Sequence, residues 1–144
     1  MSSDIEITGL EELEATLTEM GPQLVRKALH DALDYAGSVL QEGQVVTAPI
    51  LKGEHSPHPA GQLKQDIRRK IMLYPEDGIG VVAVGPSSHS FFGSFAEFGT
   101  SHQPARPWMR PAFEATQDVA LDVFIEVIDA YISEYCKEHE GETK

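Results

Sequence analysis

The 144-residue sequence lacks most features of secreted, membrane and catalytic proteins. It has one cysteine, Cys136, which excludes an internal disulfide and favours a reducing compartment. No run approaches the roughly 20 apolar residues that span a bilayer. Residues 1–15 show neither the basic nor the apolar region of a signal peptide, so we expect no secretory leader. HExxH, GxSxG and glycine-rich phosphate motifs are also missing.

Positive charge is scarce, since 11 lysines and arginines accompany 23 acids and the net charge is −12. Such a surface disfavours nucleic-acid backbone, because affinity there depends on neutralising phosphates. The charge is uneven: residues 1–20 carry acids and no base, and the one dense basic cluster is Lys64, Arg68, Arg69 and Lys70. This asymmetry suits a protein that stacks acidic surfaces on basic ones or lines an acidic channel. A surface tuned for solubility is the simpler alternative.

Apolar residues at helical spacing predict a short helix over 10–20 and a long helix over 22–46. The apolar stripe of the long helix is rich in alanine and includes Gly37 and Gly43, so we expect another element to approach it closely. Three prolines and two glycines predict a mobile loop over 49–62.

Alternating or β-favouring residues predict three to four strands, over 63–74, 79–85 and 91–99 and, as a short opening strand, over 4–8. Their short connections imply an antiparallel meander. The run 79–85 is apolar on both faces and is therefore expected at the centre of the sheet.

Pro111 suits the first turn of a helix, and the apolar spacing after it predicts a helix of about 25 residues, roughly 37 Å long. Residues 138–144 are expected to fray. The element order predicts one α+β domain over 1–144, in which an antiparallel sheet of three to four strands is packed by a long N-terminal helix and a long C-terminal helix.

The histidines give little sign of a metal site. His55 and His58 are three residues apart in a proline-rich loop, and His89 and His102 lie in other loops. A zinc site needs three or four converging ligands, and no cysteine or carboxylate accompanies them at ligand spacing. We therefore predict no metal and no cofactor. A metal-dependent hydrolase that uses His55, His58 and Glu97 is the weaker alternative.

Glu97 follows several aromatic residues at the end of an expected strand. A half-buried carboxylate there could act as an acid or base, but no second titrating group is near it in the sequence. Arg106 and Arg110 follow shortly after. An ion pair between Glu97 and one of these arginines, which holds the strand end to the next loop, is the favoured interpretation.

Acids recur every four residues on the C-terminal helix, at Glu114, Asp118, Asp122 and Glu126. Like charges at this spacing repel each other by a few tenths of a kcal/mol per pair. The row is useful if it faces a basic partner or lines an acidic lumen, and a plain solvated face is the simpler alternative.

The stretch FAEFGTSHQPARPWMRPAFEA, residues 95–115, resembles the EFGT…PARPFLRPA signature of the tail-completion, or head–tail joining, proteins of long-tailed phages, the gene-10-like family of lambdoid phages. Trp108-Met109 stands where that family has an aromatic and an aliphatic residue. ITGLEELEATL resembles the family's opening helix, and TAPILKGEHSPHPAGQLKQDI resembles its AP…TGxLRxSI segment. A longer His/Pro-rich insert before Gly61 departs from the pattern.

The resemblance implies a structural, non-enzymatic virion protein of a phage or prophage, present in the host cytoplasm before assembly. It implies a ring of copies of the chain, commonly a hexamer, at the head–tail junction. The implied partners are head connector or stopper proteins and the tail tube protein, with DNA only passing through the bore and no membrane. The motif residues are Glu97, Phe98, Gly99, Thr100, Pro104, Arg106, Pro107, Trp108, Met109, Arg110 and Pro111. An unrelated small assembly or adaptor module is the alternative function.

Within this motif we expect Gly99 to permit a sharp reversal of the chain. Pro104 and Pro107 stiffen the segment that follows. Trp108 and Met109 either anchor in an apolar pocket of a neighbouring subunit or clamp the loop onto their own sheet, and the sequence leaves both alternatives open.

Overall fold

The computed structural model describes residues 10–50, 60–74, 76–77 and 79–140. The strand expected over 4–8 and most of the loop expected over 49–62 lie outside these ranges. The elements are α1 (Leu10–Met20), α2 (Pro22–Thr47), α3 (Gln62–Gln65), β1 (Ile67–Tyr74), β2 (Ile79–Pro86), the 3-10 turn η1 (Ser88–Ser90), α4 (Phe92–Phe98) and α5 (Met109–His139). The expected α+β class and the two long helices are confirmed.

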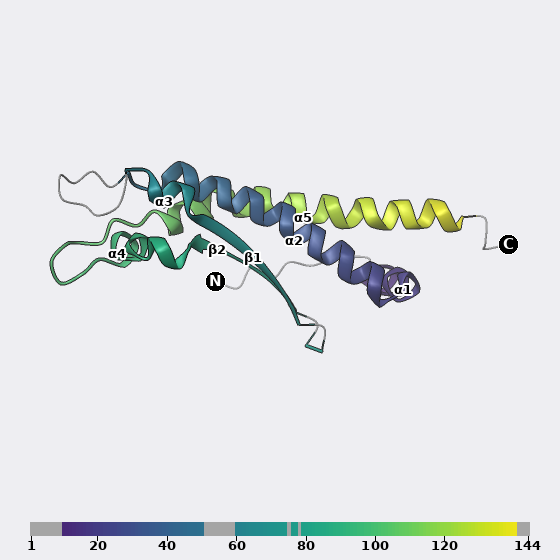
Figure 1. The fold of residues 1–144 in the computed structure, drawn as a ribbon. Coiled ribbons are helices and arrows are strands. Elements are labelled where there is room, and N and C mark those ends of the chain that lie inside the picture. Colours follow the sequence, from purple (N-terminus) through teal and green to yellow (C-terminus); the bar gives the residue numbers. More distant parts are fainter. Residues whose placement is uncertain (1–9, 51–59, 75, 78, 141–144) are drawn as a thin grey trace.

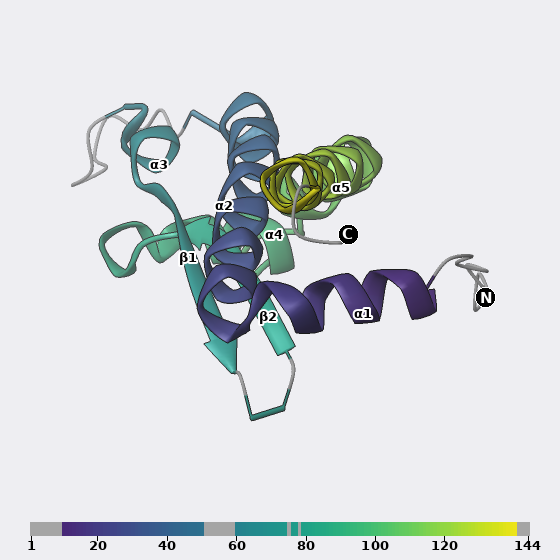
Figure 2. The same ribbon diagram turned by 90° about the vertical axis from the view of Figure 1, so that its right-hand side faces the viewer.

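Helix α2 forms the centre of the fold. It contacts both strands of the sheet on one side and α5 on the other, and Figure 2 shows it between them. Its packing surface consists largely of small residues, and Ala28, Ala32 and Ala36 are buried. Small side chains let the backbones of neighbouring elements come close, so α2 can serve two packing surfaces at once.

The two glycines of the α2 stripe mark these two close approaches. A Cβ atom built on Gly37 would lie 2.6 Å from Cγ2 of Val82 in β2. A Cβ atom on Gly43 would lie 2.7 Å from Cγ2 of Thr116 in α5. Both distances are shorter than carbon atoms tolerate, and the expected close approach is therefore confirmed on both sides of the helix.

The sheet is an antiparallel hairpin of β1 and β2, in register from Ile67 opposite Pro86 to Tyr74 opposite Ile79. Its inner face packs on α2, while its outer face is open: Ile79 is 52% exposed and Val81 38%. The expectation that β2 lies at the centre of the sheet is not met among the described residues, where it pairs with β1 alone. In the part of the chain that the structure describes, the sheet has two strands and not the expected three to four.

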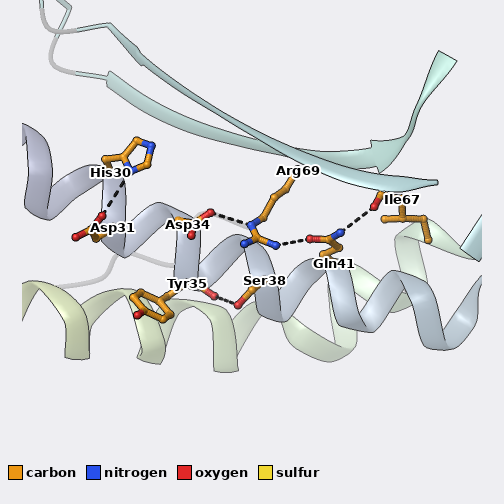
Figure 3. A network of polar contacts seen from close by, with 8 residues as sticks. All are labelled: His30, Asp31, Asp34, Tyr35, Ser38, Gln41, Ile67 and Arg69. Carbon is orange, nitrogen blue, oxygen red and sulfur yellow. Dashed lines mark hydrogen bonds and ion pairs between the residues drawn. The ribbon is translucent and has the colours of Figure 1, made fainter. Parts of the chain in front are cut away.

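A chain of polar contacts ties β1 to α2 (Figure 3). Arg69 donates a hydrogen bond to Asp34 at 2.8 Å and another to the side-chain oxygen of Gln41 at 2.5 Å. Gln41 in turn donates to the backbone oxygen of Ile67 at 2.8 Å. The hydrogen bond from Arg69 lowers the pKa of the Asp34 carboxyl. Arg69 of the basic cluster thus pairs with an acid of α2, on the inner face of the sheet.

The segment expected as a third strand, 91–99, is helical instead. Its residues 92–98 form the whole of α4, which follows the short turn η1. Its aromatic residues Phe91, Phe95 and Phe98 follow helical spacing, and Ser94 donates its hydroxyl hydrogen to the backbone oxygen of Phe91 at 2.5 Å. The many phenylalanines favour a strand by residue type, but their spacing belongs to a helix.

Helix α5 has 31 residues and is longer than expected. It includes residues 138 and 139 of the segment expected to fray, and the ring of His139 stacks on that of Tyr135 with centroids 4.0 Å apart. Upstream, Tyr131 donates a hydrogen bond to Asp31 of α2, which raises the pKa of the tyrosine to about 12. None of the helices in the described ranges is long and apolar enough to cross a bilayer.

Candidate functional site

The family-like motif forms a compact joint between α4 and α5, and Glu97 lies at its centre. The side chain is buried, with 8% of the residue exposed. One carboxylate oxygen accepts hydrogen bonds from the backbone N–H groups of Trp108 at 2.5 Å and Met109 at 2.8 Å. The other oxygen accepts one from the N–H of Arg110 at 3.2 Å. Glu97 therefore caps the N-terminus of α5 from another helix.

This cap completes a helix start that has no polar side chain of its own. The residue at the N-cap position is Trp108, which makes no side-chain capping bond. The first N–H groups of any helix have no partner within that helix. Here Glu97 binds those of residues 108–110, and Pro111 has no N–H to satisfy. The negative charge also lies at the positive end of the helix dipole.

The expected ion pair between Glu97 and an arginine is not formed. None of the ion pairs among the described residues includes Glu97, and the side chains of Arg106 and Arg110 are exposed. Arg110 contributes its backbone N–H instead of its guanidinium. Three fixed backbone N–H donors stabilise the buried carboxylate more than one flexible arginine side chain would.

Trp108 is the second element of the joint and is only 3% exposed. Its ring packs in a core cluster with Ala48, Leu63 and Ile67. The indole N–H donates to the backbone oxygen of Gly93 in α4 at 2.9 Å. The indole is therefore part of the core of its own subunit. This position agrees with the intramolecular clamp and leaves no free indole for a neighbour.

Gly99 ends α4 and reverses the chain, as expected. It has φ 76° and ψ 170°, a region that other residues rarely adopt, and a Cβ atom there would lie 2.7 Å from the backbone nitrogen of Ala105. The returning segment is held to α4, because the N–H of Arg106 donates to the oxygen of Ala96 at 2.6 Å. We call the unit of α4, residues 99–108 and the first turn of α5 the α4–α5 joint.

The remaining motif residues lie on the surface of the joint. Met109 is half-buried, and the exposed members are Phe98, Thr100, Pro104, Arg106, Pro107, Arg110 and Pro111. Sequence reasoning missed that Phe98 belongs to an exposed aromatic row with Phe91 and Phe95, which we call the phenylalanine row. Their exposed fractions are 77%, 55% and 45%. The spacing at i, i+4 and i+7 was the available signal.

The acidic row of α5 also lies at the surface. Glu114, Asp118, Asp122 and Glu126 are all exposed. None of the ion pairs found in the described ranges includes a member of this row. Two large apolar residues, Leu121 and Ile125, are exposed on the same helix at 49% and 55%. The row is available for a partner or a lumen.

The hydrolase alternative depends on Glu97 and the loop histidines. Both carboxylate oxygens of Glu97 accept hydrogen bonds from backbone N–H groups at the start of α5. No group of three or more potential metal ligands occurs among the residues that the structure describes. His89 and His102 are exposed, while His55 and His58 fall outside the described ranges.

The chain was also compared with known proteins. No family model, curated protein or solved structure matches it.

Proposed function

We propose that this chain is a structural subunit of a ring at the head–tail junction of a long-tailed phage, and not an enzyme. The observation that carries the proposal is how the family-like motif is used. Glu97 caps α5, Gly99 reverses the chain and Trp108 fills the core. All three fix the shape of the joint, as an assembly subunit requires.

The ring contact belongs to the exposed part of the motif. Because Trp108 is buried in its own subunit, it is not the anchor of a neighbour. Phe98, Arg106 and Arg110 project from the joint instead. Phenylalanine and arginine are side-chain types that can supply apolar area and charge-assisted bonds at an interface.

The acidic row faces the bore in this proposal. Glu114, Asp118, Asp122 and Glu126 are exposed on a helix whose opposite side packs on α2. A negative lining repels DNA phosphates and lets the genome pass without adhering. The other partners are the head connector or stopper proteins and the tail tube protein, and the site of action is the assembled virion.

The decisive experiment starts with the mass of the purified chain in solution and electron microscopy of the same sample. We expect rings of several copies. The chain is then labelled and located on phage particles, where we expect the label at the neck between head and tail. Rings with the label elsewhere on the particle, or absent from it, would favour an adaptor module instead.

The metal-dependent hydrolase is less well supported, because the Glu97 carboxylate is committed to α5. Metal analysis of protein purified without chelators tests it directly. A stoichiometric metal content together with a turnover that is lost in the Glu97→Gln variant would replace the structural proposal.

A further inference from the structure

The phenylalanine row is an unusual feature of one end of the molecule. Phe91 and Phe95 pack edge to face with centroids 5.6 Å apart, and Phe98 lies one turn further along α4. Single exposed apolar residues are common on protein surfaces, but a contiguous aromatic row marks an interaction site more often. Figure 1 places α4 at the end of the molecule away from α1 and the hairpin turn.

The opposite end carries an apolar hollow, which we call the elbow groove. It lies where α1 joins α2 and has a volume of about 590 Å³, with Leu13, Leu17 and Val25 among its lining residues. A second cavity of about 310 Å³ shares Pro22 and Val25 with the first and extends to the hairpin at Ile79. A cavity of about 150 Å³ accommodates a benzene ring. The elbow groove is therefore large enough for phenylalanine side chains.

The two ends also differ in charge. The α4–α5 joint, which includes the phenylalanine row, carries the exposed arginines Arg106 and Arg110, and the backbone of Arg106 is bonded directly to α4. Beside the elbow groove, α1 carries no base and presents the exposed acids Glu11, Glu12, Glu14 and Glu19, of which Glu14 lines the groove. The exposed Arg26 of α2 lies at the second cavity, so the acids outnumber the base there. Opposite potentials on two apolar surfaces favour their association and fix their orientation.

We infer that the phenylalanine row of one subunit docks into the elbow groove of a second copy of this chain. The two surfaces lie at opposite ends, so a subunit cannot satisfy its own groove. The contact is heterologous, because it joins two different surfaces of identical chains. Repetition of such a contact closes a ring or extends a filament. The assignment of that ring to a phage neck rests on the function proposed above.

Two variants test the contact from its two sides. Phe95→Ser with Phe98→Ser removes two of the three rings of the row, and neither residue belongs to the core cluster. Thr18→Trp fills the groove from an exposed lining position. Each is expected to weaken self-association by at least about 100-fold in sedimentation analysis. Ile125→Ser, an equally exposed change on α5, is the control and should retain assembly.

Mixing the two defective proteins provides the sharpest result. The row-deficient chain keeps its groove and the groove-filled chain keeps its row, so one intact contact forms between them and growth stops at a heterodimer. A mixture that remains monomeric overturns the proposal, as does full assembly by either variant alone. A wild-type chain that stays monomeric up to about 1 mM also overturns it.

Charge reversal supplies an independent check. Arg106→Glu with Arg110→Glu should weaken assembly, and Glu11→Arg with Glu14→Arg on the partner chain should restore it. Absence of rescue contradicts the pairing of these two ends. If rings form that depend on the phenylalanine row but the chain is not found at phage necks, the contact stands and the neck assignment is refuted. If the chain is found at the neck even when the row is removed, the neck assignment stands and the contact is refuted.

Discussion

The two ends of the molecule use their residues in opposite ways. At the α4–α5 joint, the Glu97 carboxylate, the first N–H groups of α5 and the Trp108 indole satisfy one another, and the side chains that matter are buried. At the elbow, α1 packs lightly on α2, and an apolar groove remains open beside exposed acids. The joint keeps one subunit in shape, whereas the elbow has surface left for another.

This difference separates residues that hold the fold together from residues that can contact another molecule. The buried members of the motif, Glu97 and Trp108, act inside the fold, whereas its exposed members and the elbow groove lie at the surface. Replacing matched residues at the two ends separates the roles, because damage to the buried side chains of the joint should lower stability, whereas changes in the elbow groove should alter association more than stability.

The largest expected effect is at Trp108. Trp108→Ala leaves a cavity in the core and removes the bond to Gly93, so we expect a loss of about 3–5 kcal/mol in the free energy of unfolding. Leu17→Ala, at the half-buried elbow position, should cost about 1 kcal/mol. Chemical denaturation measures both. A Trp108→Ala protein of normal stability that no longer self-associates would return the indole to the intersubunit contact.

The next effect compares two glycines in the same backbone region, Gly99 at φ 76° and ψ 170° and Gly21 at φ 83° and ψ 159°. Alanine costs about 1–3 kcal/mol at either position for the backbone alone. At Gly99 the new Cβ also meets Ala105, whereas at Gly21 nothing lies within 4 Å. We therefore expect the larger loss of melting temperature for Gly99→Ala. Equal losses of melting temperature would show that the close contact with Ala105 adds no cost at position 99.

The Glu97 cap should follow. Glu97→Gln replaces an oxygen that accepts hydrogen bonds by an NH₂ group that faces other donors, so we expect a loss of about 1–3 kcal/mol. Glu14→Gln beside the elbow groove is the matched control and should change stability by less than about 0.5 kcal/mol. Urea denaturation of both variants decides this. A neutral result for Glu97→Gln would mean that the carboxylate is dispensable for the start of α5.

The smallest effect lies between the two ends, at the pair of Asp34 and Arg69. The side chain of Asp34 is 42% exposed, so Asp34→Asn should cost less than about 1 kcal/mol at neutral pH. Because the pKa of Asp34 is lowered in the folded protein, its contribution is present above 3.8 and is lost as pH falls below that value. The wild-type and variant stability curves should therefore converge in acid. A difference that persists at pH 2–3 would contradict the pairing.

The sequence predicted the parts of the fold that carry a long periodic signal. Helices α2 and α5 follow apolar spacing over many turns, and the β1–β2 hairpin follows alternation with a short turn. Helix α4 was missed because a short aromatic-rich segment favours a strand by residue type. The outer face of β2 was misjudged because sequence shows that a face is apolar but not whether anything covers it.

The role of Glu97 was harder to predict, because its partners are backbone groups 11 to 13 residues away. Side-chain reasoning finds the nearest opposite charge and therefore favours an arginine. A clue was present in the start of α5, where Trp108 stands in place of the Ser, Thr, Asp or Asn that usually caps a helix. A helix start that lacks its own capping side chain, with a single carboxylate upstream, indicates that the carboxylate caps the helix.

The reversal between α4 and α5 has a practical use. The N–H of Gly99 is bonded to Phe95 and that of Arg106 to Ala96, which holds both sides of the reversal to α4. The intervening tip at Ser101 and His102 is exposed. Such tips tolerate inserted peptides. A short epitope placed there would give each copy of the chain a handle for antibodies or gold, while the helices on either side keep their positions.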